Sequence, residues 1–218
     1  MRILVFGAGA IGSVLGGFLA KSGHEVTLLG RAWHLDVIRR HGLRISGLWG
    51  EHCVTNLVLA TRPQDLAQGA AFDWVFVCVK AHQTAEAASA LAALLGPRTL
   101  VCAFQNGLGN YETLTQAIAP ERVALGRVIF GVEIAPGHVR VTVCADEVLI
   151  GAPDQRVGRE PLAGLVSSLR ESGIPARATT TILTALWAKV LYNCALNGLS
   201  TLLEVSYGTL LEHPQARP

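Results

Sequence analysis

Short continuous apolar runs alternate along the chain with longer segments in which apolar residues recur at helical spacing. The runs predict strands buried on both faces, and the segments predict helices that cover them. We expect strands at residues 3–6, 25–29, 74–79, 99–104, 123–132, 138–144 and 147–150, a strand pair at 43–46 and 53–60, and helices ending at Lys21 and spanning 84–95, 157–172 and 181–203. This alternation predicts an α/β fold with a doubly wound sheet, whose ligands bind at the carboxyl ends of its strands.

Residues 1–23, MRILVFGAGAIGSVLGGFLAKSG, admit three interpretations. They carry no charge between Arg2 and Lys21, as in a secretion signal, and Gly12-x-x-x-Gly16 matches the packing face of a membrane helix. Three glycines within the motif would weaken either helix by about 1 kcal/mol each. As strand, turn and helix, the same residues place Gly-x-Gly-x-x-Gly at a strand end, with a second strand at 25–29. This third interpretation is favoured and predicts a Rossmann-type nucleotide-binding unit.

Each residue of the glycine motif has an expected part in binding a dinucleotide. Gly7 makes the tight turn, Gly9 lets a pyrophosphate approach the backbone, and Gly12 lets the helix pack on the strand. Ala10 and Ile11 open the helix, whose N-terminal N–H groups and positive dipole end attract phosphate. These five residues are therefore predicted to bind the cofactor.

The residue after the second strand indicates which cofactor is bound. NAD-binding proteins place Asp or Glu there to accept a hydrogen bond from the ribose 2′-hydroxyl. This chain has Gly30-Arg31, and a guanidinium suits the 2′-phosphate of NADP. The alternative is that Arg31 merely begins a solvated helix. We predict NADP as the cofactor, with Arg31 on its 2′-phosphate.

The composition of the chain limits which partners and which cellular location we expect. The chain is 16% charged with a net charge of +2 and has no block of like charges, so neither nucleic acid nor an anionic membrane is an expected partner. The five cysteines lack C-x-x-C spacing and the seven histidines lack ligand spacing, so we expect no metal site. Buried free thiols, favoured over disulfides, indicate a cytoplasmic location. The cysteines are Cys53, Cys78, Cys102, Cys144 and Cys194.

Two turns at predicted strand ends carry candidate site residues. Lys80 lies between a strand and a helix, where a cation opposes the helix dipole and would face an anionic or hydroxyl-rich group. Asn106 begins an Asn-Gly pair after the strand at 99–104. An ordinary exposed lysine and a plain tight turn are the alternatives. Both turns would fall on one sheet edge and would frame a single cleft.

The segment at 181–203 is apolar on nearly every side, which predicts a central buried helix or a membrane span. A lysine at mid-membrane costs about 2.5–3.5 kcal/mol, which disfavours the span. Lys189, Asn193 and Asn197 are spaced i, i+4 and i+8, so they share one narrow stripe. A polar stripe on such a helix predicts a polar ligand against it, with a satisfied core network as the alternative.

GAGAIG with Arg31, VKAHQT, QNGLGN and LWAKVLYNCALNGLSTL, in this order, resemble the ketopantoate reductase (2-dehydropantoate 2-reductase) family. The resemblance extends over residues 1–205. It implies NADPH-dependent reduction of a 2-keto acid to pantoate, on the route to pantothenate and coenzyme A. It further implies that Gly7, Gly9 and Gly12 bind the pyrophosphate and that Arg31 binds the 2′-phosphate.

The resemblance also assigns the reacting groups. It implies that Lys80 and Asn106 lie near the nicotinamide ribose and the substrate, that Lys189 is the general acid, and that Asn193 and Asn197 hydrogen-bond the substrate. Hydride transfer to a ketone leaves an alkoxide, which a nearby ammonium can stabilise and protonate. Burial should lower the pKa of that lysine toward the working range.

We expect a nucleotide-binding domain at 1–178 and a shortened helical substrate or dimerisation domain at 179–218. The family's later helices carry a Ser-Met segment and an acidic residue, and we expect both to be missing because the chain ends at Pro218 and its only methionine is Met1. An NADP-binding module with little catalysis and an opine-type or other 2-keto acid dehydrogenase remain alternatives to the reductase. Residues 204–218 are too few to cover the apolar helix, so we expect a homodimer.

Overall fold

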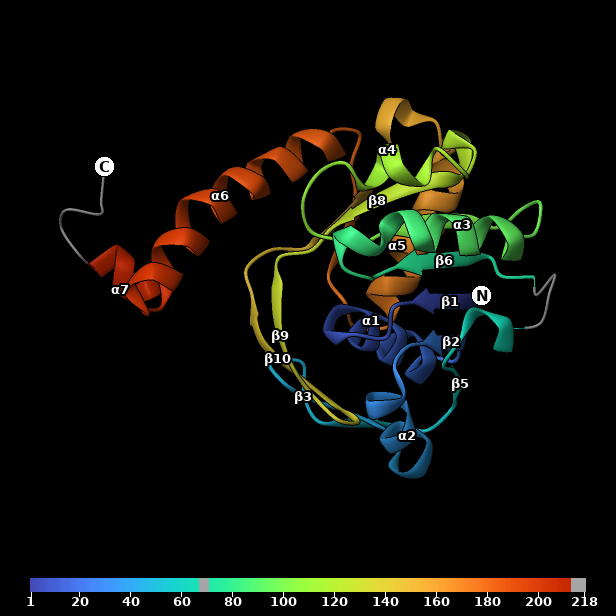
Figure 1. Ribbon diagram of the computed structural model, residues 1–218, viewed down its shortest axis with the longest axis horizontal. Helices are drawn as coiled ribbons and strands as arrows, with labels where there is room; N and C mark the ends of the chain where they lie inside the picture. The colour runs from blue at the N-terminus through green and yellow to red at the C-terminus, as the bar shows by residue number, and fades with distance from the viewer. Residues whose placement is uncertain (67–70, 213–218) are drawn as a thin grey trace.

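The computed structural model describes residues 1–66 and 71–212, which form an α/β body with a helical projection at the C-terminal end (Figure 1). Residues 213–218, which belong to the expected domain at 179–218, lie outside the described residues. The main sheet contains β1 (Arg2–Phe6), β2 (Glu25–Leu29), β5 (Leu57–Ala60), β6 (Trp74–Val77), β7 (Leu100–Ala103), β8 (Val123–Arg127), β11 (Val148–Gly151) and β12 (Ala176–Ala178).

The strand order of the main sheet is β12-β11-β8-β7-β6-β1-β2-β5. Strands β8, β7, β6, β1, β2 and β5 are parallel, whereas β11 pairs antiparallel with β8. Because β1 pairs with β2 on one side and β6 on the other, its register places Ile3 opposite both Val26 and Trp74. Successive strands are therefore added first on one side of β1 and later on its other side, as in a doubly wound sheet, and the predicted fold class is confirmed.

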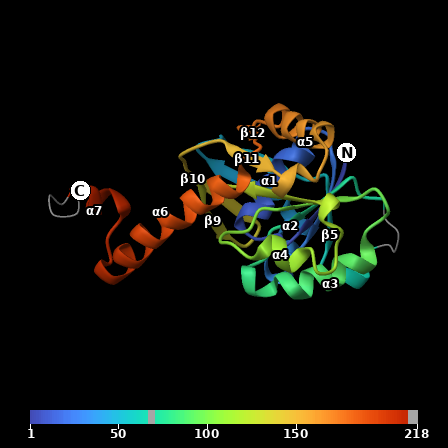
Figure 2. The same ribbon diagram turned by 90° about the horizontal axis from the view of Figure 1, so that it is seen from above.

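Helices cover both faces of this sheet (Figure 2). The helices are α1 (Ala10–Lys21), α2 (Ala32–His41), α3 (Thr84–Leu94), α4 (Asn110–Leu114), α5 (Arg159–Glu171), α6 (Ile182–Leu203) and α7 (Tyr207–Glu212). Alternate residues of each buried strand point to opposite faces. Ile3 and Phe76 therefore pack with α1 and α5, while Leu4 and Val75 pack with α3 and α4. Two apolar cores thus hold the strand ends, where ligands would bind, in fixed positions.

A second sheet of four strands lies beyond α1, and the apolar pattern did not predict it. It contains β3 (Leu43–Gly47), β4 (His52–Val54), β9 (Phe130–Ala135) and β10 (His138–Cys144), in the order β4-β3-β10-β9. Two expected strands are corrected by it. The strand at 53–60 is split between β4, which pairs with β3, and β5, which pairs with β2. The strand at 123–132 is split between β8 in the main sheet and β9 in the second.

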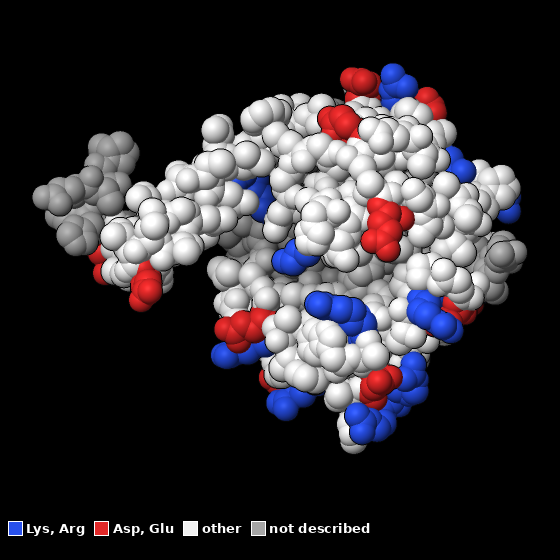
Figure 3. All heavy atoms as spheres, viewed as in Figure 1, with Lys and Arg blue, Asp and Glu red and all other residues white. Residues whose placement is uncertain are grey.

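Helix α6 extends away from the body (Figure 1). Only Ile182 and Leu186, in its first two turns, are buried against the sheet. Beyond them Trp187, Leu191 and Leu202 are exposed, the last by 82%. The expectation of a buried central helix is therefore wrong for this chain, because within the described residues α7 packs against its far turns at Tyr207 but leaves most of their side chains exposed. Lys189 is its one charged residue, and Figure 3 shows the projection as largely uncharged.

Candidate active site

The turn between β1 and α1 has a backbone conformation at Gly7 that only glycine adopts without strain. Gly7 has φ 113°, and a Cβ there would lie 2.7 Å from the backbone N of Val79. The amides of Gly7 and Ala8 both donate to Leu29 O, at 3.0 and 2.8 Å. The turn is therefore wedged between the ends of β2 and β6, at the carboxyl edge of the sheet.

The other two glycines of the motif have different environments. A Cβ on Gly12 would lie 2.3 Å from Gly7 O and 2.8 Å from Val5 Cγ1, so α1 packs directly on β1 there. A Cβ on Gly9 would meet nothing within 4 Å. The first helical bond of α1 runs from Ser13 N to Gly9 O, so the preceding amides of Ala10, Ile11 and Gly12 remain available to a ligand. Gly9 lines the cleft described next, whereas Ala10, Ile11 and Gly12 do not, and the binding of an anion by these amides stays a prediction.

A cleft of about 540 Å³ opens beside this turn. It is lined by Gly7, Gly9, Arg31 and Lys80 together with parts of α3. Arg31 is exposed and precedes α2, and its guanidinium carbon lies 5.7 Å from the Trp33 ring. Lys80 is also exposed and precedes the short 3-10 helix Ala81–Gln83 that leads into α3. Four of the predicted cofactor residues therefore face one cavity of dinucleotide scale.

Lys189 reaches back from α6 to the sheet edge. Its Nζ donates to Asn106 Oδ1 at 2.6 Å and to the backbone oxygen of Val128. Asn106 follows β7 and Val128 follows β8, so the ammonium lies across the carboxyl ends of two neighbouring strands. The structure thus brings together two predicted site residues that are 83 positions apart in the chain. One of the three ammonium N–H groups is left for a ligand.

Burial changes the acidity of this lysine. Removal from water, followed by the nearby charge of Arg127, lowers the pKa of Lys189 from its ordinary 10.5 to about 8. Both effects disfavour the charged form. An ammonium with such a pKa is still mostly protonated at neutral pH but gives up its proton far more readily than an exposed lysine, as a general acid requires.

A buried polar network connects the loops after β6 and β7. Gln105 Nε2 donates to Val79 O at 3.0 Å and to Thr84 Oγ1 at 2.8 Å, and the Thr84 hydroxyl donates to Asn110 Oδ1 at 3.0 Å. The Asn110 amide in turn donates to Asn106 O at 3.2 Å. This chain of bonds fixes the position of the Asn106 backbone and hence the partner of Lys189. Thr84, Gln105 and Asn110 lie within the motifs VKAHQT and QNGLGN, but no role was predicted for them individually.

The two further asparagines of the α6 stripe lie beyond this contact. Asn193 is half-buried, while Asn197 is exposed and its Oδ1 accepts a hydrogen bond from the Tyr207 hydroxyl of α7. They share the helix with Lys189, as their spacing predicted, but lie one and two turns farther from the sheet. Their binding role stays a prediction.

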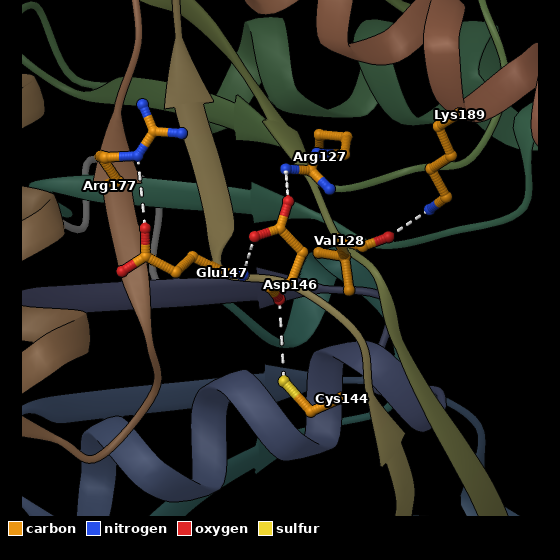
Figure 4. A network of polar contacts seen from close by, with 7 residues as sticks. All are labelled: Arg127, Val128, Cys144, Asp146, Glu147, Arg177 and Lys189. Atoms are coloured by element: carbon orange, nitrogen blue, oxygen red, sulfur yellow. Dashed lines mark hydrogen bonds and ion pairs between the residues drawn. The ribbon is translucent and has the colours of Figure 1, made fainter.

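An ion pair between Arg127 and Asp146 lies beside Lys189 (Figure 4). Arg127, at the end of β8, donates from Nη2 to Asp146 Oδ2 at 2.7 Å, and its side chain is only 5% exposed. The guanidinium, and then the Glu147 backbone N–H, hold the pKa of the Asp146 carboxyl below its usual range. Sequence reasoning missed both residues. The signal was an arginine inside the otherwise apolar run VALGRVIF.

Three further expectations concern the cysteines, metal binding and membrane spans. All five cysteines are free thiols, but only Cys102 is fully buried, and Cys53 and Cys194 are exposed, so the expectation of buried thiols holds only in part. Among residues 1–66 and 71–212, no three His, Cys, Asp or Glu side chains cluster in a way that could hold a metal ion. No helix in these ranges has the length and apolar character needed to cross a membrane.

A doubly wound sheet with a glycine turn, and a lysine ammonium held at the same sheet edge, define a dinucleotide-dependent oxidoreductase. Residues 3–155 match the family described as Ketopantoate reductase PanE/ApbA, and residues 181–218 match Ketopantoate reductase PanE/ApbA C terminal. The chain belongs to the ketopantoate reductase family. The resemblance seen in the sequence is thereby confirmed.

Relatives and solved structures agree with this assignment. A 2-dehydropantoate 2-reductase of Aquifex aeolicus (strain VF5) is 37% identical over 218 residues, which cover 100% of this chain and 68% of the relative. A PanE/ApbA family ketopantoate reductase from Ralstonia eutropha JMP134 has a TM-score of 0.85 at 34% identity, covering 99% of this chain and 69% of that one. A ternary structure of D-mandelate dehydrogenase with NADH and anilino(oxo)acetate also has a TM-score of 0.85, at 27% identity and the same coverage.

Proposed function

We propose that this chain reduces 2-dehydropantoate to pantoate with NADPH, and that Lys189 is the general acid. The contact between Lys189 Nζ and Asn106 Oδ1 at 2.6 Å carries the proposal. It puts an ammonium of lowered pKa at the carboxyl edge of a nucleotide-binding sheet, where a nicotinamide ring extending from the cleft would meet a substrate. Its relatives at 37% and 35% identity are named 2-dehydropantoate 2-reductases, which supports the same reaction.

The bound cofactor would supply the hydride, and the protein's residues would bind the cofactor, hold the substrate and donate the proton. Gly7, Gly9, Ala10, Ile11 and Gly12 would hold the pyrophosphate through backbone N–H groups and the helix dipole. Lys80 and Asn106 would contact the nicotinamide ribose and the substrate. Lys189 would stabilise the oxyanion that develops at the keto carbon and donate its proton there, and Asn193 and Asn197 would hydrogen-bond the substrate.

The preference for NADPH rests on Arg31. It lies in the cleft after β2, and the one carboxylate among the described residues of the cleft is Glu86 on α3. A guanidinium without a neighbouring acid at the end of β2 favours the 2′-phosphate over a free 2′-hydroxyl. The D-mandelate dehydrogenase neighbour holds NADH, so the two cofactors must be compared directly.

NADPH oxidation followed at 340 nm tests the proposal. The substrates are 2-dehydropantoate, pyruvate, 2-oxo-2-phenylacetate and a mixture of an amine with a keto acid, each at equal concentration. Faster turnover of 2-dehydropantoate than of the other three is expected. Turnover only with the amine mixture would instead favour an opine-type dehydrogenase, and tight NADPH binding without turnover would favour a cofactor-binding module.

A homodimer, a cytoplasmic location and the division at residue 178 accompany this proposal. The exposed Trp187, Leu191, Leu199 and Leu202 of α6 support the dimer, since a second copy laid against this face would remove apolar surface from water. Light scattering at tens of micromolar should give twice the mass of the 23.1 kDa chain. A stable monomer would contradict the dimer without affecting the proposed reaction.

A further inference from the structure

We propose that Arg127 binds the carboxylate of the keto acid, so that the pocket it shares with Lys189 selects 2-keto acids over ketones without a carboxylate. This inference rests on the proposed function and adds a specificity residue to it. Three observations carry it: the position of the pocket, the free hydrogen-bonding capacity of the buried guanidinium, and the charge of the pocket as a whole.

The pocket has a volume of about 440 Å³ and lies between α6 and the ends of β8 and β10. Its polar members are Arg127, Asp146, Lys189 and Tyr192, and its remaining wall consists of Ile129 and three alanines. This is the composition of a small-ligand site, in which a few polar groups orient a ligand against apolar walls. Figure 4 shows Arg127 and Lys189 on either side of Val128, with the Asp146 carboxylate hydrogen-bonded to the guanidinium on the side away from Lys189.

The guanidinium of Arg127 has more donors than partners. It carries five N–H groups, and its one hydrogen bond to a described residue joins Nη2 to Asp146. Its Nε is buried without a partner among the described residues. Burying a guanidinium whose side chain is 5% exposed and whose Nε has no partner among the described residues is costly unless a ligand supplies an acceptor. A carboxylate is the acceptor that matches the planar fork of a guanidinium.

The charge of the pocket fits a monoanion. Arg127 and Lys189 contribute two positive charges, and Asp146 contributes one negative charge, so the pocket carries one net positive charge while Lys189 is protonated. In a 2-keto acid the carboxylate carbon is bonded directly to the keto carbon. The group that protonates the keto oxygen and the group that binds the carboxylate must therefore face the same small volume. Arg127 is the cation beside Lys189 that meets this requirement.

The test compares an acid with its neutral counterpart in wild type and variants. 2-Dehydropantoate and its lactone, 2-dehydropantolactone, present the same ketone with and without a carboxylate. Arg127→Leu should raise the KM for the acid about ten- to a hundredfold, the usual effect of losing a charge-assisted bond, and change kcat/KM for the lactone less than threefold. Arg127→Lys should recover part of the loss. Because Arg127→Leu leaves the Asp146 carboxylate without its partner, the double variant Arg127→Leu, Asp146→Leu is measured as well.

Arg177→Leu is the matched control, since Arg177 also pairs with an acid, Glu147 at 3.3 Å, but lies outside the pocket. It should change neither the KM for the acid nor kcat/KM for the lactone. Equal losses on acid and lactone in the Arg127 variants, or an unchanged KM for the acid, would overturn the inference. If the wild type reduces no keto acid, the proposed function fails, and calorimetric binding of the keto-acid isostere oxamate to the NADPH-loaded chain decides the inference alone. Binding weakened tenfold or more by Arg127→Leu supports it, and absent or equal binding refutes it.

Discussion

Replacing Gly12 with alanine should destabilise the protein, whereas replacing Gly9 should weaken cofactor binding and leave stability unchanged. The two glycines are three residues apart in one motif, but a Cβ on Gly12 would lie 2.3 Å from Gly7 O, and a Cβ on Gly9 would meet nothing within 4 Å. Overpacking of this kind costs about 1–3 kcal/mol, only partly offset by the better helix propensity of alanine, about 1 kcal/mol. Because the 2.3 Å contact is with a backbone oxygen, which cannot move aside as a flexible side chain could, the upper part of this range applies, and we expect a net loss of about 1–2 kcal/mol for Gly12→Ala.

Gly9 has φ −88°, which alanine adopts readily, so Gly9→Ala should keep the free energy of unfolding within about 0.5 kcal/mol of wild type. Its methyl group would project into the open space where a pyrophosphate is proposed to lie. An affinity loss of about tenfold for NADPH, or 1.4 kcal/mol, is expected. Urea unfolding followed by circular dichroism measures the first quantity, and fluorescence titration with NADPH measures the second.

Gly164→Ala, on α5, controls for the general effect of the substitution, because a Cβ there also meets nothing within 4 Å. It should raise stability slightly and leave NADPH binding alone. Full NADPH affinity in Gly9→Ala would refute the proposed pyrophosphate position. Wild-type stability in Gly12→Ala would refute the close packing of α1 on β1.

Two further predictions concern charged residues of the site. Arg31→Ala should lower the affinity for NADPH about tenfold or more and leave NADH binding unchanged, because only NADPH carries the 2′-phosphate; equal effects on both cofactors in a fluorescence titration would argue against this role. Since Lys189 must be protonated to donate and its pKa in the free protein is about 8, kcat/KM should fall as the pH rises through about 8. A rate that stays constant up to pH 10 would exclude Lys189 as the proton donor.

The parts of this fold that the sequence predicts well are those where local geometry leaves one solution. Gly-x-Gly-x-x-Gly after a buried run requires a turn such as the one at Gly7, with its φ of 113°. The strand at 25–29 and the helix ending at Lys21 lie where they were expected. The spacing of Lys189, Asn193 and Asn197 also places them on one continuous helix. These features depend on residues only a few positions apart.

The parts it predicts poorly depend on which element lies beside which. The apolar run at 123–132 is continuous in sequence, yet β8 ends at Arg127 and β9 begins at Phe130 in another sheet. The short strand β12 has two exposed residues among its three and gives no apolar run to detect. Hydropathy identifies α6 as apolar but cannot say what covers it. The pairing of Lys189 with Asn106, and of Arg127 with Asp146, is likewise set by tertiary packing.

The central claim is that Lys189 protonates a 2-keto acid reduced at this sheet edge. Its most direct test is NADPH oxidation with 2-dehydropantoate by wild type and Lys189→Ala, together with the NADPH dissociation constant of each. We predict turnover by wild type, a kcat lower by about 10²–10⁴ in Lys189→Ala, and nearly equal NADPH affinities. Wild-type turnover by the variant, or a variant that loses activity only because it no longer binds NADPH, would contradict the claim.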